Sequence, residues 1–172
     1  MACSNISAGV LNGCSSNQGG LEAIFIANGK VADFSETDGV VTSIAVGSAA
    51  LGPSDFFKFE VPRQTSSISE TATGDVSQGT VTYLQTAVMV LNQLQASTRN
   101  QLKLMFEATD MVVVAKDNNG VYWSIGLSRG AYGQTATTTS GVAYQDRSGY
   151  EITIEGMEPS PMFQVTSSIV SA

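Results

Sequence analysis

The sequence predicts a mainly β fold, an antiparallel β-sandwich or barrel with one packed α-helix at about residues 98–109. The first observation behind this prediction is a hairpin pattern, in which two β-branched and aromatic runs, 111–115 and 121–125, flank Asn118-Asn119-Gly120. Asn and Gly readily adopt the positive φ angles that a tight turn requires. The second observation is strict alternation of side chains over residues 149–156, which is typical of a strand with one buried face. That alternation places Tyr150, Ile152 and Ile154 on one face and Glu151, Thr153 and Glu155 on the other.

The N-terminal third of the chain predicts short strands separated by glycine turns. Apolar runs are bounded by Gly29-Lys30 and by Asp38-Gly39, and both pairs are typical turn residues. Pro62 makes it difficult to continue a strand in the middle of a sheet. The predicted elements, in order, are a strand at 21–27, weak alternation over 31–51 with a strand at 40–46, a loop at 47–55 and a strand at 56–61.

Residues 63–79 contain almost no apolar side chains except Ile68, Ala72 and Val76. This composition predicts a loop projecting from the domain, or a strand whose partner lies in another subunit. Long unstructured loops are uncommon in compact domains and are usually functional. We therefore expect the segment to have a role in assembly or binding.

Residues 80–93 form an unusually long strand-like pattern that is rich in Thr and Val. A helix from Tyr83 onward is the alternative, since four apolar residues also fit a helical stripe. The Thr and Val content favours the strand, and a strand of this length suits a sheet shared between subunits. The four residues of the alternative stripe are Leu84, Ala87, Val88 and Leu91.

The predicted helix begins at a capping box, Thr98-Arg-Asn-Gln101. Leu102, Met105, Phe106 and Thr109 follow at helical spacing, so the helix should lie against the sheet. Residues 135–141 are Thr-rich and predict a polar loop before the last strand.

Length and charge indicate one domain, residues 1–172, with a surface suited to assembly. Only 13% of the residues are charged, about half of the usual share of roughly 25%. Lys and Glu are depleted at protein interfaces, so a surface poor in them can be covered by neighbouring subunits. The formal net charge of −7 argues against a protein that grips nucleic acid, because phosphate binding needs clustered Lys and Arg. A conduit wall that repels phosphate remains compatible with this charge.

The absence of histidine argues most strongly against an enzyme, because it removes the commonest general base and metal ligand. Cys3 and Cys14 are the only cysteines, too few for a zinc site, and we expect free thiols or a disulfide formed in an oxidising medium. We therefore expect no catalytic residues, no metal and no cofactor. The N-terminus shows neither the basic start nor the apolar core of a signal peptide, and no run is as long as a membrane helix.

Two carboxylate pairs and one aromatic pair are the candidates for a catalytic or sugar-binding site. Glu151 and Glu155 lie on one strand face about 13 Å apart at ~3.3 Å per residue, beyond glycosidase spacing. Asp33 and Glu36 are the second pair, and a solvated surface explains both pairs better. Tyr122 and Trp123 could stack on a sugar, but neighbouring strand residues point to opposite faces, so at most one is exposed.

The order of motifs in residues 111–159 resembles the C-terminal half of bacteriophage tail tube (major tail) proteins. It comprises the hairpin, a Gly-bounded stretch at 126–130, the Ser/Thr/Gly tract and the strand Gly149-Tyr-Glu-Ile-Thr-Ile-Glu-Gly156 followed by Met157-Glu158-Pro159. The N-terminus, with Cys3, Gly9-Val-Leu, Gly13-Cys14 and Gly19-Gly20-Leu before the apolar 23–27, is similar to the opening of a subset of these proteins. The resemblance implies a structural virion protein whose hexameric rings stack into a hollow tube for genome delivery.

The resemblance also implies sites and partners. The 63–79 segment would contact a neighbouring subunit or ring, with Arg63, Gln64, Ile68, Glu70 and Asp75 as candidate contacts. The N-terminal segment would contribute to stacking, and Glu70 and Asp75 are candidate acids of the lumen. Partners would be further copies of the chain and other tail proteins, with DNA passing through the lumen unbound and no insertion into a membrane. The protein would be assembled in the host cytoplasm and reside in the tail. The alternatives are the inner tube of a bacterial contractile injection or secretion system and, less favoured, a carbohydrate-binding β-sandwich module.

Overall fold

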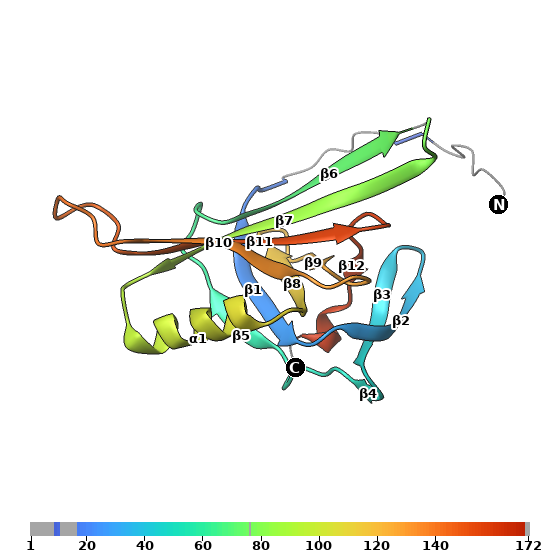
Figure 1. Ribbon diagram of the computed structural model, residues 1–172, viewed down its shortest axis with the longest axis horizontal. Helices are drawn as coiled ribbons and strands as arrows, with labels where there is room; N and C mark the ends of the chain where they lie inside the picture. The colour runs from blue at the N-terminus through green and yellow to red at the C-terminus, as the bar shows by residue number, and fades with distance from the viewer. Residues whose placement is uncertain (1–8, 11–16, 76, 171–172) are drawn as a thin grey trace.

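The computed structural model describes residues 9–10, 17–75 and 77–170, and two β-sheets and one α-helix make up most of this part of the chain (Figure 1). The larger sheet has the strand order β2-β3-β12-β9-β8-β1-β5, with β4 paired to β3, and the smaller has the order β10-β11-β7-β6. All pairings are antiparallel except that of β12 with β3. The predicted β-sandwich with one helix is confirmed.

The strands and helices have the following bounds. The strands of the larger sheet are β1 (Leu21–Asn28), β2 (Val31–Thr37), β3 (Val40–Val46), β4 (Ala49–Ala50), β5 (Phe57–Glu60), β8 (Met111–Asp117), β9 (Tyr122–Ile125) and β12 (Gln164–Val165). Those of the smaller sheet are β6 (Ser67–Asp75), β7 (Thr80–Asn92), β10 (Tyr132–Thr139) and β11 (Gly149–Glu158). The helix α1 is Ala96–Glu107, and a short 3-10 helix is Ser167–Ile169.

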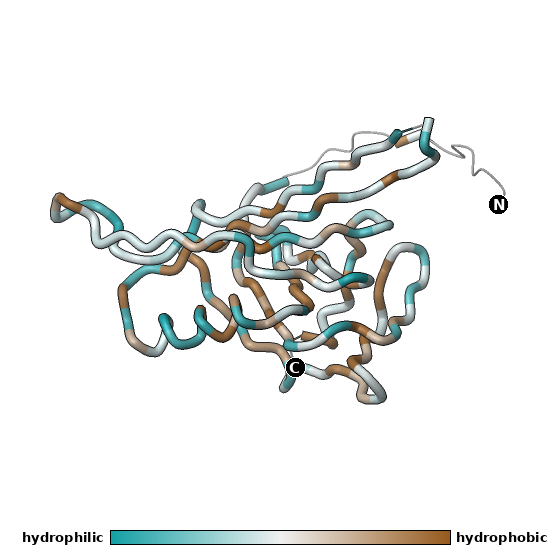
Figure 2. The backbone as a smooth tube through the Cα atoms, in the orientation of Figure 1, coloured by the Kyte–Doolittle hydropathy of each residue, from teal (hydrophilic) through white to brown (hydrophobic). Residues whose placement is uncertain are grey.

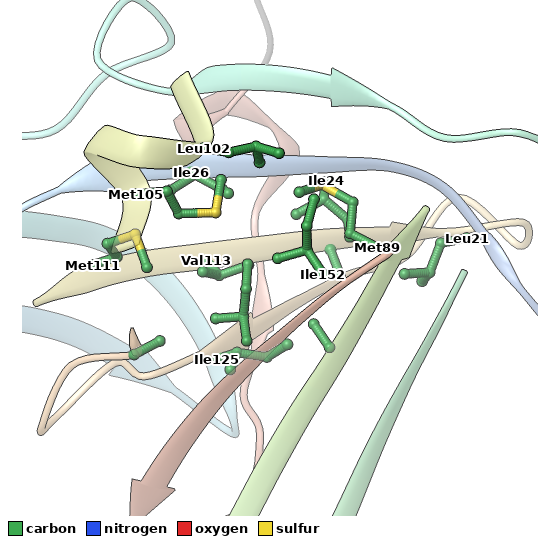
Figure 3. Packing of buried hydrophobic residues seen from close by; sticks show 14 of the residues in the cluster. Leu21, Ile24, Ile26, Met89, Leu102, Met105, Met111, Val113, Ile125 and Ile152 are labelled. Carbon is green, nitrogen blue, oxygen red and sulfur yellow. The ribbon is translucent and has the colours of Figure 1, made fainter. Parts of the chain in front are cut away.

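The main core lies between the two sheets and is closed by the helix (Figure 3). Ile24 and Val113 from the larger sheet meet Ile152 from the smaller, and Leu102 and Met105 of α1 complete the cluster. A second cluster covers the other face of the larger sheet and includes Val165, Ile169 and Val170 from the C-terminal segment. Strand β8 lies between the clusters, which is why its sequence is a continuous apolar run instead of alternating.

The helix begins two residues before the predicted capping box. Gln95 is the N-cap residue and makes no side-chain capping bond, so Thr98 lies inside the first turn and the predicted capping box is wrong. Leu102 and Met105 are buried as predicted, whereas Thr109 is exposed beyond the end of the helix. Phe106 packs under β10, where its ring lies 2.9 Å from the position that a Cβ on Gly133 would take.

Residues 135–141 were expected to form a loop, and residues 63–79 a projecting loop or a strand paired with another subunit; both segments contain a strand paired within this chain. Residues 67–75 pair with β7 along their whole length, and residues 132–139 pair with β11 in the same way. Most side chains of both strands are exposed, so neither shows the hydrophobic alternation from which a strand is predicted. On one side of each strand, the backbone groups pair with β7 or with β11. The 63–79 segment therefore forms one arm of an extended hairpin whose partner strand is in the same chain (Figure 1).

The 80–93 strand and two of the predicted turns are confirmed. β7 spans Thr80–Asn92, and the helical alternative is wrong. Asp38 and Gly39 have φ angles of 53° and 79°, as a tight hairpin turn requires. In the β8–β9 turn only Gly120 has a positive φ, and Asp117 organises the turn by accepting bonds from the backbone N–H groups of Asn119 and Val121.

A buried polar joint connects the smaller sheet to the 126–130 loop that follows β9. Glu158 is 3% exposed, and its carboxylate accepts hydrogen bonds from the backbone N–H groups of Ser128 (3.0 Å) and Arg129 (2.8 Å). Gln85 is 2% exposed; its Oε1 accepts from the N–H of Gly126, and its Nε2 donates to the carbonyl of Ser160. Because buried polar groups are costly without partners, these bonds fix how the loop lies on the sheet.

Candidate assembly surface

The smaller sheet ends in two strands whose outer edges are unpaired within the described residues. These edge strands are β6, with nine residues, and β10, with eight. Free edges of this length are templates for pairing with another chain, and proteins that remain monomeric usually protect them with Lys, Pro or short strands. Neither edge strand contains Lys, Arg or Pro. The two edges are therefore the strongest candidates for contacts between subunits.

The polarity of the strands allows the two edges to pair with each other in a head-to-tail array. All neighbours within the sheet are antiparallel, so β6 and β10, at opposite edges of four strands, also run in opposite directions. A second copy placed beside the first would bring its β10 against β6 in antiparallel orientation. Each copy would then use one edge for each neighbour, and a closed ring would leave no edge of the smaller sheet free.

The two edge strands are offset along the strand direction. The residues of β11 that pair with β10 pair on their other side with Thr86–Asn92 of β7. Strand β6 pairs with Thr80–Val88 of β7. The midpoints of β10 and β6 are thus offset by about five residues, or roughly 17 Å along the strand direction. The two strands lie roughly 14 Å apart across the sheet. These two distances correspond to a strand tilt of roughly 50°, close to the ~35–45° typical of closed barrels. A stagger of this size is compatible with closure of the sheet into a barrel.

The outer face of the smaller sheet, which points away from the core, is rich in hydroxyl groups. Cross-strand partners share a face, so the pairing register identifies its members. The four strands contain no Lys or Arg. Asp75, Glu151 and Glu155 are the acids on this face, and Glu151 is ion-paired with Arg147. The Ser and Thr residues of the face are Ser67, Ser69, Thr71, Thr73, Thr80, Thr82, Thr86, Thr135, Thr137, Thr139 and Thr153.

Glu70 lies on the opposite face from Asp75, which separates the two candidate lumen acids. The Oε2 of Glu70 accepts hydrogen bonds from the backbone N–H of Met162 (2.6 Å) and from Nε2 of Gln85 (3.3 Å). Glu70 therefore holds the C-terminal segment against the sheet and is not part of the hydroxyl-rich face. Glu151 and Glu155, unlike Glu70, lie on the same face as Asp75.

Asp75 lies at the tip of the β6–β7 hairpin and stabilises the turn. Its Oδ1 accepts hydrogen bonds from the hydroxyl and the backbone N–H of Ser77 and from the N–H of Gln78. The Ser77 hydroxyl, followed by the Ser77 N–H, lowers the pKa of this carboxyl below its usual 3.8. Asp75 is thus charged at neutral pH and exposed at one end of the hydroxyl-rich face.

The other three predicted contact residues lie where β6 begins. Arg63 and Gln64 are exposed, and Gln64 has a φ of 61°, which bends the chain sharply before β6. Ile68 is half-buried and packs against the main core, so its role is in packing. Cys3, Cys14, Val76 and most of the N-terminal segment expected to contribute to stacking lie outside the described residues.

The acidic and aromatic candidates of the sequence mostly make structural contacts in the described part of the chain. The described residues hold no group of three or more acidic, Cys or His side chains close enough to bind a metal ion. Glu36 accepts a bond from the N–H of Gly39, which explains it as a turn residue. Tyr122 is buried and Trp123 is half-buried with its Nε1 directed to Asp117, so the aromatic pair offers no flat exposed platform. Over the same ranges, no helix combines the length and hydropathy needed to span a membrane.

Comparisons with protein-family models, with curated proteins and with solved structures find no match for this chain.

Proposed function

We propose that the protein is a structural subunit of a bacteriophage tail tube, which forms rings by pairing β6 of one copy with β10 of the next. The observation that carries the proposal is the match between these two edges in length, polarity and offset. The rings would stack into a hollow conduit through which the genome leaves the virion. The mechanism is geometric, because the protein needs to assemble and enclose a channel rather than to perform chemistry.

The dimensions of such a ring suit a DNA duplex. With four strands per copy at ~4.8 Å spacing, six copies span a circumference of roughly 115 Å and a diameter of at least roughly 37 Å. Inward-pointing side chains on both walls occupy roughly 10 Å of this diameter, and strand tilt widens the ring further. A ring of three copies would have half the diameter and no usable lumen. The hexamer that the resemblance implies is therefore of the right size.

The hydroxyl-rich face supports DNA as the cargo. In a barrel closed by β6–β10 pairing, the core and the larger sheet lie outside, so this face lines the lumen. The four strands of this wall contain no Lys or Arg, and the nearby Arg147 is ion-paired with Glu151. With Asp75 and Glu155 also on it, the wall offers no cluster of cations to hold a phosphate. The duplex would then slide instead of binding. The inner tube of an injection machine would use the same ring geometry, but the lumen charge favours a polyanion that must move.

Proline substitution on β10 tests the edge pairing directly. In an edge strand, the backbone N–H groups point alternately toward the neighbouring strand and toward the open edge. One of the two substitutions Thr137→Pro and Thr138→Pro therefore removes an N–H that points to the open edge, and the other removes a hydrogen bond to β11. The outward variant should keep the melting temperature of the unmodified protein and lose assembly measured by light scattering. The inward variant identifies itself by a lowered melting temperature. Normal ring formation by the outward variant would contradict the proposed edge pairing.

A further inference from the structure

The loop at residues 140–148, which connects β10 to β11, carries two fully exposed apolar side chains at the end of a projecting arm. Val142 and Tyr144 have relative exposures of 102% and 112%, and Figure 2 shows a hydrophobic tip on an otherwise weakly polar arm. The loop is nevertheless ordered by its own bonds. Oδ2 of Asp146 accepts from the N–H groups of Val142 (2.9 Å) and Ala143 (2.8 Å). At the base of the arm, the carbonyl of Ser148 accepts from the N–H of Gln93.

An ordered Tyr with no contacts in its own chain has the properties of a binding anchor. Tyr is among the residues that dominate interface energetics, because it contributes a large contact area at low conformational cost. The order imposed by Asp146 lowers that cost further, since the loop is already shaped before a partner arrives. We name residues 140–148 the arm tip.

Edge pairing determines where the arm tip of one copy would lie on the next. If β10 pairs with β6 of a neighbour over its full length, antiparallel polarity places Tyr132 near the neighbour's Asp75 and Thr139 near its Ser67. The arm tip continues past Thr139 and therefore runs beside residues 63–66 of the neighbour. These residues immediately precede β6 in the sequence.

A pocket of about 850 Å³ opens beside those residues. It lies between the segment that enters β1 and the segment that leaves β5, and Leu21 and Val61 supply apolar surface in its wall. Arg63 and Gln64 also line it. Among the described residues, no carboxylate lies within 4 Å of the Arg63 guanidinium. This cation is available to stack on an aromatic ring and to attract the charge of Asp146.

We infer that the pocket beside Arg63 and Gln64 receives the arm tip of the adjacent copy in the ring, with Tyr144 as the anchor. The inference rests on the proposed tube function and deepens it, because it assigns a second contact to each β6–β10 junction. The anchor sets the register of the pairing. A polar, Thr-rich edge specifies register weakly by itself, and a side chain seated in a pocket prevents a slip by two residues.

Cysteine cross-linking tests the contact. In a background with Cys3→Ser and Cys14→Ser, one chain carries Tyr144→Cys and a second carries Gln64→Cys. Mixing the two under oxidising conditions should give a disulfide-linked dimer on non-reducing gels, whereas either chain alone should not form this heterodimer. Leu104→Cys in place of Tyr144→Cys is the matched control, because Leu104 is also exposed but lies on α1. It should not cross-link to position 64.

A truncation variant measures what the contact contributes to assembly. Tyr144→Ser should raise the concentration needed for ring assembly by at least about tenfold, the effect of an anchor residue, and Leu104→Ser should leave it unchanged. Tyr144→Ser should also keep the melting temperature, since the side chain makes no contacts within the monomer. Two results together would overturn the arm-tip contact and leave the tube proposal intact: normal ring assembly by Tyr144→Ser, and no cross-link between Tyr144→Cys and Gln64→Cys chains. A chain that forms no rings and no cross-link at any concentration would overturn both.

Discussion

At the scale of single residues, the acids of this chain serve structure more than chemistry. Glu70, Asp75, Asp146 and Glu158 each accept hydrogen bonds from backbone N–H groups, and each connects or orders a segment that side-chain packing alone would leave loose. Glu158 is the most deeply buried of the four. The strongest effect of removing one carboxylate on stability is therefore expected there.

Glu158→Gln should destabilise the fold by about 1–3 kcal/mol, because the amide retains one acceptor and turns a donor toward a buried N–H. Urea unfolding followed by fluorescence measures the change in the free energy of unfolding. Glu155→Gln is the matched control, since the same chemical change on the same strand affects a partly exposed side chain and should stay within about 0.5 kcal/mol. Equal effects of the two substitutions would contradict the role given to Glu158.

The order of the arm tip should depend on pH through Asp146. Hydrogen bonds from the N–H groups of Ala143 and Val142 lower the pKa of this carboxyl below its usual 3.8. A lowered folded-state pKa means that the stabilisation is present above the unfolded value and is lost as the pH falls through the folded value. NMR titration of the Asp146 carboxyl should give a midpoint below 3.8, with the amide signals of Val142 and Ala143 shifting in parallel. A midpoint at or above 3.8 would show that the capping bonds do not form in solution.

At the scale of elements, the 126–130 loop lies against β11 of the smaller sheet with its backbone in close contact. Gly126 has a φ of 71°, and a Cβ there would lie 2.3 Å from the backbone N of Ala131. Gly156 of β11 passes over it, and a Cβ at that position would lie 3.1 Å from the Cα of Gly126. No side chain fits between these backbones.

Gly126→Ala should therefore destabilise the protein far more than the ~1–2 kcal/mol cost of a left-handed alanine. Gly39→Ala isolates that conformational cost, because Gly39 has a φ of 79° and nothing within 4 Å of its Cβ position. Thermal unfolding of the two variants gives the comparison. If Gly126→Ala melts no lower than Gly39→Ala, the close approach of loop and sheet is wrong.

Elements with side-chain periodicity could be predicted from the sequence, and those held by backbone pairing could not. The β8–β9 hairpin and β11 were predicted because burial gives their sequences a visible pattern, a continuous apolar run in β8 and alternation in β11. β10 was missed, and the strand alternative for β6 was given a partner in another subunit instead of β7. The side chains of both strands are mostly exposed, so only the neighbouring strand determines their conformation. Glu70 was assigned to the wrong face for the same reason, since a face is defined only once the register is known. Gln85, a polar residue inside an apolar strand, was the one available signal for the buried polar joint.

At the scale of the whole molecule, this chain leaves open the edges that a monomer would protect. The larger sheet and the helix bury the core, whereas the smaller sheet extends beyond it as two hairpin arms that project at opposite ends (Figure 1). Few charges, unprotected edges and an outer face of Ser and Thr all favour a protein that is completed by its neighbours. We therefore expect stability to depend mainly on the core of the sandwich and assembly to depend on the smaller sheet.

Electron microscopy of the purified protein at high concentration tests the central claim most directly. We expect rings or tubes with an open lumen, in which β6 and β10 of adjacent copies form one continuous barrel and the face carrying Glu151 and Glu155 lines the channel. A closed ring with the larger sheet toward the lumen, or assemblies in which β6 and β10 remain unpaired, would contradict the claim.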